Sequence, residues 1–218
     1  MVIEMGNYAM KDLKIVGDGT YPGGDYERVA ITGNGIVSGN VVAKEAKFTG
    51  SCTVQGDATF QYFKITGQGD VEGDLISEEV KVTGELNVGS IRTELLKIKG
   101  FLNSSGNIEV EEMNVKGGFD IEGSQNVGQL VVNLQMAPSA VTEIGGEEIL
   151  IKSKSLLNRK YRLEADLIEG DTIYLEYTTA KVVRGNDIEL GPGCQIGLVE
   201  YRENFENRDS KVGEAKKI

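Results

Sequence analysis

Pairs of apolar residues with one residue between them recur at a nearly constant interval along most of the chain. Each pair, together with the residue between, forms a triplet. The apolar pairs are Leu13/Ile15, Val29/Ile31, Ala46/Phe48, Phe63/Ile65, Val80/Val82, Leu96/Ile98, Met113/Val115 and Leu130/Val132. This spacing is typical of a β-strand with one buried face. The pattern therefore predicts eight strands that all face the same way and stack into two apolar columns.

Two glycines accompany each triplet and divide the repeat. The first set is Gly17, Gly33, Gly50, Gly67, Gly84, Gly100 and Gly117, and the second is Gly23, Gly39, Gly56, Gly73, Gly89, Gly106 and Gly123. A short polar residue follows the second glycine in six of the units, namely Asn40, Asp57, Asp74, Ser90, Asn107 and Ser124. Glycine and short polar side chains favour tight turns, so each repeat is expected to contain corners.

Two further apolar sets complete the repeat. The first contains Ile36, Val54, Val71, Val88 and Ile121, and the second contains Val41, Ala58, Leu75, Ile91 and Ile108. Three short strands and three corners fit in about 17 residues at about 3.3 Å per residue. Antiparallel hairpins would reverse the facing in alternate strands, whereas a climbing coil preserves it. We therefore predict an all-β fold, a right-handed parallel β-helix, or solenoid, with 16–17-residue coils.

The pattern also suggests boundaries. We expect an N-terminal tail over 1–12, a β-helix of about eight coils over 13–135, and a loop or bend over 136–147, which contains Pro138 and a Gly-Gly pair. Further β-helix-like coils are expected over 148–202, where Ile151, Ile168, Val183 and Val199 return at a similar interval. The polar segment 203–218 is predicted to be a flexible C-terminal tail.

Composition narrows the function. The chain has 218 residues, a formal net charge of −11 and no histidine. The acidity disfavours nucleic-acid binding, and the lack of histidine removes every mechanism that needs an imidazole. We expect a cytoplasmic protein without an integral membrane segment, because no signal peptide and no apolar run of about 20 residues is present. Cys52 and Cys194 fit no disulfide framework or zinc motif, and Cys52 is expected in the core.

Candidate chemistry is sparse. The glycine-rich run 32–39 is interpreted as corners, Asp70, Glu72 and Asp74 as a solvated edge, and the column Lys14, Lys47, Lys64, Lys81 and Lys97 as a solvated face. Tyrosines and glutamates gather in the C-terminal part, at Tyr161, Tyr174, Tyr177, Tyr201, Glu164, Glu169 and Glu176. We predict no enzyme, no catalytic residue, no cofactor and no metal site.

The tandem units resemble a known family. Residues 46–57, 63–74 and 80–86 look like the bactofilins, polymer-forming cytoskeletal proteins of bacteria, and 167–171, 182–186 and 188–194 look like longer bactofilin-related proteins of Gram-positive bacteria. The resemblance implies a scaffold that assembles end to end without nucleotide and organises envelope, cell-shape or motility machinery. It also implies paralogous bactofilins or envelope and motility proteins as partners, and peripheral association with the membrane.

The ends of a β-helix are the predicted assembly sites, because each exposes unpaired backbone groups and an apolar cross-section. We assign the interface to Leu13, Ile15, Val183 and Val199. Two alternatives are a non-polymerising adaptor with a capped β-helix, and a glycan-binding or carbohydrate-active β-helix that uses the C-terminal Tyr/Glu cluster.

Overall fold

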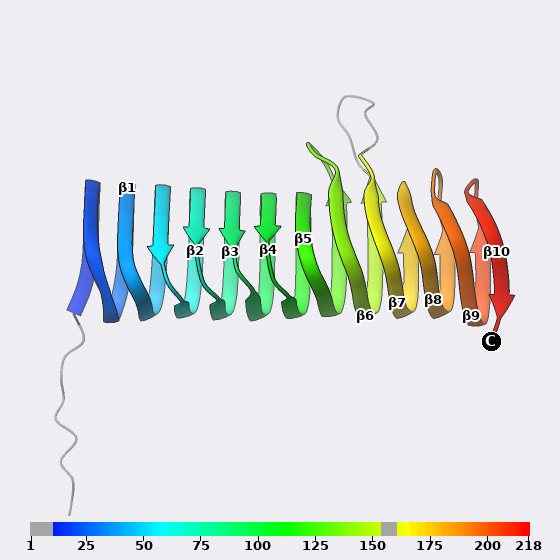
Figure 1. Ribbon diagram of the computed structural model, residues 1–218, viewed down its shortest axis with the longest axis horizontal. Coiled ribbons are helices and arrows are strands. Elements are labelled where there is room, and N and C mark those ends of the chain that lie inside the picture. The colour runs from blue at the N-terminus through cyan, green and yellow to red at the C-terminus, as the bar shows by residue number, and fades with distance from the viewer. Residues whose placement is uncertain (1–10, 154–160) are drawn as a thin grey trace, which may run out of the picture.

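The computed structural model describes residues 11–153 and 161–218 and shows one rod of stacked coils (Figure 1). The strands are β1 (Lys11–Gln55), β2 (Ala58–Val71), β3 (Leu75–Val88), β4 (Ile91–Ser104), β5 (Ile108–Leu134), β6 (Ser139–Ser153), β7 (Leu163–Leu175), β8 (Thr178–Leu190), β9 (Gln195–Asn207) and β10 (Lys211–Lys217). They form one sheet in chain order, and every neighbouring pair is parallel. The predicted all-β parallel solenoid is confirmed.

The register keeps the apolar columns in phase. Ile65 pairs with Val82, which pairs with Ile98, and that residue pairs with Val115. Every residue of the predicted triplet pairs is buried, the most exposed being Leu13 at 9%. One column position was wrong: Ile36 is 37% exposed, whereas its neighbour Val37 is fully buried. Val37 lies one repeat before Val54, so the inward position is the second of these two adjacent apolar residues.

The two sets of glycines serve different physical needs. Gly67 has a φ of +120°, and a Cβ there would collide with the carbonyl oxygen of Gly50 in the preceding coil. Gly73 lies outside the left-handed region, but a Cβ would still approach the carbonyl oxygen of Gly56 to 2.9 Å. The first set is thus required by backbone conformation and, from Gly33 onward, by stacking, whereas Gly73 is required by stacking alone.

The polar corner residues connect successive coils. The amide of Asp57 donates to Asn40 Oδ1 at 2.9 Å, and the amide of Asp74 donates to Asp57 Oδ1 at 3.0 Å. Farther along, the amide of Ser124 donates to Asn107 Oδ1 at 3.0 Å. These side chains therefore satisfy backbone donors of the next coil, where no strand pairing does so.

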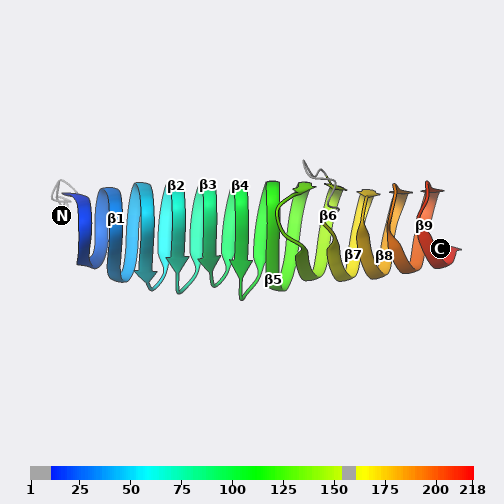
Figure 2. The ribbon, with the colours of Figure 1, turned by 90° about the horizontal axis from the view of Figure 1, so that it is seen from above.

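Several predicted boundaries differ from the structure. The predicted loop 136–147 is mostly strand, because β6 begins at Ser139. The predicted tail 203–218 is also largely strand, since β9 extends to Asn207 and β10 pairs with it in parallel. Lys11 and Asp12 belong to β1, and the other residues of the predicted N-terminal tail lie outside the described residues. Figure 1 and Figure 2 both show the coils from β5 to β10 continuing as one rod.

The coil changes between β5 and β6. Earlier strands pair at sequence offsets of 16 or 17, but Gln125 pairs with Ile144 and Ile144 pairs with Ile168, which are offsets of 19 and 24. Ile151 therefore lies in a different column from Ile168, contrary to the predicted spacing, and pairs with Leu175 instead. The corner glycines also move. Gly146, Gly170 and Gly185 are in register at a new corner, at the position that Val127 holds in β5.

Candidate functional site

A groove of about 1000 Å³ follows one side of the rod from β3 to β9, across the change in coil shape. Small residues form much of its floor, namely Gly128, Gly145, Gly146, Gly170 and Gly185. They are glycines because the coils stack closely there: a Cβ on Gly170 would approach the carbonyl oxygen of Gly146 to 2.6 Å. Because the residues at these closely stacked positions have no side chains, the surface is hollow there.

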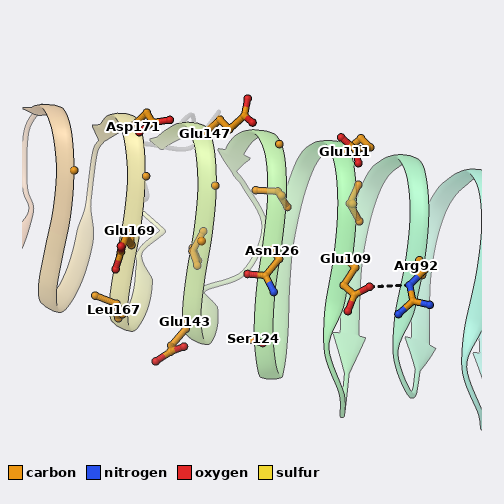
Figure 3. A pocket seen from close by; sticks show the side chains of 18 of the residues that line it. Arg92, Glu109, Glu111, Ser124, Asn126, Glu143, Glu147, Leu167, Glu169 and Asp171 are labelled. Carbon is orange, nitrogen blue, oxygen red and sulfur yellow. Dashed lines mark hydrogen bonds and ion pairs between the residues drawn. The ribbon is translucent and has the colours of Figure 1, made fainter.

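Carboxylates dominate the walls of the groove. Glu94, Glu109, Glu111, Glu143, Glu147, Glu169 and Asp171 line it, against the cations Arg92, Arg184 and Arg202. In Figure 3, Glu111, Glu147 and Asp171 lie along one margin, with Glu109 and Glu169 nearer the middle. The groove thus presents negative charge at intervals of about one coil.

Ion pairs with arginine neutralise part of this negative charge. Arg92 Nε lies 2.7 Å from Glu109 Oε2 (Figure 3), and Arg184 bridges Glu169 at 3.1 Å and Glu200 at 2.8 Å. The hydrogen bond from Arg92 and its charge lower the pKa of Glu109. A general acid would need the opposite shift, since it must stay protonated near neutral pH. Arg92 therefore holds Glu109 in its carboxylate form, which does not suit a general acid.

The structure divides the predicted Tyr/Glu cluster between two sides of the rod. Tyr174 and Glu176 lie together, and the Tyr174 hydroxyl donates to Glu176 Oε1 at 2.9 Å. Tyr201 is in register with Gly185 at the glycine corner and packs on Phe205, with ring centroids 5.6 Å apart. Glu169 lies in the groove and is paired with Arg184.

The three remaining members of that cluster are Tyr161, Glu164 and Tyr177. Tyr161 packs against the core, and its carbonyl oxygen accepts a hydrogen bond from Ser153 Oγ at 3.1 Å. Glu164 is exposed and in register with Thr179. The backbone amide of Tyr177 donates to the Pro192 carbonyl oxygen at 2.9 Å. The Ser153 amide donates to Glu176 Oε2 at 3.1 Å, so Tyr161 lies near the Tyr174/Glu176 pair. Glu169 and Tyr201 lie at the groove and the glycine corner instead, so the seven residues do not converge on one site.

The predicted assembly residues are all interior. Leu13, Ile15, Val183 and Val199 are 9%, 1%, 0% and 0% exposed. Val183 pairs with Val199, and Val199 pairs in turn with Ala215 of β10. The C-terminal pair is thus covered by a further coil, and the accessible apolar residues beyond it include Phe205, Val212, Ala215 and Ile218.

Sites for metals or thiol chemistry are not formed by the described part of the chain. Within residues 11–153 and 161–218, no group of three or more Cys, Asp or Glu residues is arranged to hold a metal ion. Cys52 and Cys194 are buried free thiols, and burial raises the pKa of both. Cys52 is 0% exposed, which confirms its predicted place in the core.

Sequence reasoning missed the groove and one polar core residue. Gln125 is 0% exposed, and its Oε1 has no hydrogen-bond partner among the described residues. Both features lie where the pairing offset changes, so they depend on a register that the regular repeat does not predict. The available signal was the renewed glycine spacing at Gly170 and Gly185, together with acidic residues one repeat apart at Glu94 and Glu111.

Comparison with known proteins gives two partial relatives. The chain is 41% identical over 99 residues to YhbF of Bacillus subtilis (strain 168), which covers 44% of this chain and 42% of YhbF. It is 37% identical over 91 residues to YhbE of the same organism, covering 39% of this chain and 38% of YhbE. Both are described as uncharacterized proteins, and the chain spans about two fifths of their length. No family model and no solved structure matches. No helix of the described residues is long and apolar enough to cross a membrane.

Proposed function

We propose that this chain is a structural scaffold of the bactofilin type, which assembles end to end without nucleotide. The observation that carries the proposal is the uninterrupted parallel sheet, in which each coil is the hydrogen-bonded template for the next. A stack of this kind can be extended by another copy without a change of fold, because the joint repeats the contacts already made between coils.

The C-terminal end supports this proposal. Strand β10 pairs with β9 only through residues 195–201, so Phe205 and the rest of β9 have no strand above them in the described chain. The outward edge of β10 likewise pairs with no strand among the described residues. Open backbone edges recruit further strands unless charges or a cover prevent it.

The last coil also supports the adaptor alternative. Strand β10 contains Lys211, Glu214, Lys216 and Lys217 and is almost entirely exposed. Polar terminal repeats cap solenoids and keep them soluble. The two functions therefore differ in whether this edge is joined to another copy.

The proposal extends to cellular context. We infer a cytoplasmic rod that associates peripherally with the membrane and organises envelope, cell-shape or motility proteins, or paralogous bactofilins. The resemblance of residues 46–57 and 63–74 to bactofilins supports this inference. The dispersal of the Tyr/Glu cluster makes the glycan-binding alternative weaker.

Sedimentation and negative-stain imaging of the purified chain over a range of concentrations, with and without ATP or GTP, test the proposal. We expect end-to-end oligomers that grow with concentration and are indifferent to nucleotide. Val212→Arg and Ala215→Arg should shorten them, because both place charge on the open end. Thr59→Arg, a matched change on the exposed side of β2, should leave them unchanged. A monomer at every concentration would contradict assembly and support the capped adaptor.

A further inference from the structure

One outward-facing column of residues runs along the rod beside the triplet columns. We call it the outward column: Lys47, Lys64, Lys81, Lys97, Asn114, Val131, Leu150, Tyr174, Glu189 and Glu206. Strand pairing connects Lys47 through Asn114 and, separately, Val131 through Glu206. Val131 follows Asn114 by one repeat inside β5, the offset that also links Ser124 with Asn107.

The column changes sign along its length. Its first four residues are lysines and its last two are glutamates. The flanking columns do not add to this trend, because they carry a net −1 in each half, and the sign change comes from the outward column itself. In the basic half, Lys99 and Lys116 join the four lysines against Glu45, Glu79 and Glu112, for a net +3. In the other half, five carboxylates stand against two cations for a net −3, namely Glu148, Glu176, Asp187, Glu189 and Glu206 against Lys152 and Arg208.

Most lysines of the basic half make no ion pair with any other described residue. Lys81 Nζ lies 2.7 Å from Glu79 Oε1. Among the described residues, Lys47, Lys64 and Lys97 make no ion pair. Some cations on other faces are paired, as in Lys44 with Glu27 and Lys181 with Asp166. The acidic half keeps some pairing of its own, because Arg208 binds both Glu189 and Glu206 at 3.1 and 3.0 Å.

The middle of the column is apolar. Val131 and Leu150 are adjacent in register, and both are only partly buried although their side chains point away from the core. A basic half, an apolar centre and an acidic half form a surface that is complementary to itself when one copy is reversed.

We propose that two copies of this chain pair side by side and antiparallel through the outward column. The two-fold axis lies between Val131 and Leu150 and is perpendicular to the rod. One coil away from the centre, Asn114 faces the second copy's Tyr174. Beyond that, Lys97 faces Glu189 and Lys81 faces Glu206. Such an isologous contact is closed, so it pairs rods without generating an open lateral sheet.

Charge selects this orientation over the parallel one. In a parallel pair related by an axis along the rod, each residue faces its own copy, so that Lys64, Lys81 and Lys97 would oppose lysines. Antiparallel pairing replaces these repulsions with attractions, and like-charge contact is an effective means of excluding a wrong arrangement. The flanking columns add no like-charge contact, because Leu95 then lies opposite Asp187 and Glu79 opposite Asn204.

The area is sufficient for a weak dimer. The overlap spans eight successive positions from Lys81 to Glu206. At about 4.8 Å per coil and about 15 Å of face width, it buries roughly 600 Å² on each copy. The total of about 1,200 Å² is at the lower limit for specific interfaces. We therefore expect a dimer with a Kd of about 10–100 μM that weakens as salt rises. This contact uses no residue of the open end, so it is independent of end-to-end assembly.

Sedimentation velocity on the Val212→Arg background, in which the open end carries a charge, tests the proposal separately from end-to-end growth. At low salt, Lys81→Glu with Lys97→Glu should weaken the dimer at least tenfold, and Glu189→Lys with Glu206→Lys should do the same. The chain with all four changes should recover wild-type affinity to within about threefold, because the two halves are exchanged. Far-ultraviolet circular dichroism of each variant checks that the β-fold persists.

Cross-linking determines the orientation. Thr83→Cys and Glu206→Cys chains, mixed and treated with a short bismaleimide, should give mixed dimers, whereas a parallel pair would give Thr83→Cys homodimers. The native thiols are buried and should not react. A monomer at every concentration, homodimers of the Thr83→Cys chain, or failure of the four-change chain to recover would overturn the proposal. Binding of the lysine half to vesicles rich in anionic lipid, without any dimer, would assign this face to a membrane instead.

Discussion

Replacing Gln125 with methionine should stabilise the rod. Gln125 is fully buried in the column that also contains Ile108 and Ile144, each of which is no more than 1% exposed. Its Nε2 donates to Met113 Sδ at 2.9 Å, but its Oε1 has no partner among the described residues. Methionine has a similar length and volume and brings no polar atom that needs a strong hydrogen bond.

The expected gain follows from the two contacts that change. An unsatisfied buried polar group costs about 1–3 kcal/mol, and removing it recovers that amount. The bond to the Met113 thioether is lost, and a weak acceptor of this kind is worth at most about 0.5–1 kcal/mol. The net stabilisation should be about 1–2 kcal/mol, which corresponds to a rise in Tm of about 2–8 °C for a chain of this size.

Urea denaturation and thermal melting of Gln125→Met beside wild type measure this gain. Gln125→Glu is the opposing control, because it places an unpaired carboxylate at the same buried position and should cost about 3 kcal/mol or more at neutral pH. A Gln125→Met chain that melts below wild type would refute the reasoning, since it would mean that Oε1 has a stabilising partner. Comparison of the m-values establishes whether the unfolding unit is unchanged.

Three further substitutions test the fold. Val82→Asp puts a charge between Ile65 and Ile98 and should cost about 3–5 kcal/mol in urea melts, whereas the adjacent Lys81→Asp should cost less than about 1 kcal/mol; equal costs would contradict the facing. Gly67→Ala adds a collision with Gly50 to backbone strain, so its denaturation midpoint should fall well below that of Gly39→Ala, where φ is +92° but nothing lies within 4 Å. Desolvation and Glu176 raise the pKa of Tyr174 to about 12. The folded state therefore favours the neutral phenol. This stabilisation is complete below about pH 10 and is lost as the pH rises towards 12. Tyr174→Phe should therefore flatten the plot of Tm against pH in this range.

The repeat alone was sufficient to predict the coil, because burial repeats with the period of the hydrogen-bonded stack. The apolar pattern cannot identify a strand that is held by backbone pairing alone, without buried side chains. Strand β10 pairs with β9 along its backbone, yet Val212 is its only partly buried residue and the others are exposed. Its sequence therefore lacks the apolar alternation that identified the other strands, and the segment resembled a flexible tail.

The glycines after Pro138 misled the sequence analysis for a different reason. Gly145 and Gly146 suggested a loop, but Gly146 is a corner in register with Gly170 and Gly185. The longer pairing offset between β6 and β7 hides this relation, because the regular period no longer aligns the three glycines. The groove and Gln125 depend on the same shifted register, so neither could be derived from the repeat.

The physical division within each coil indicates where function resides. Inward positions must fill a closed cross-section, so residues such as Val82, Ile98 and Val115 change little from coil to coil. Outward positions are free of that constraint, because the backbone hydrogen bonds that hold the stack do not depend on them. The residues of the outward column can therefore change from lysine at Lys47 to glutamate at Glu206 without weakening the rod. Core packing does not require this gradient of charge. This ordered surface is where we propose that the chain recognises a second copy of itself and the direction of that copy.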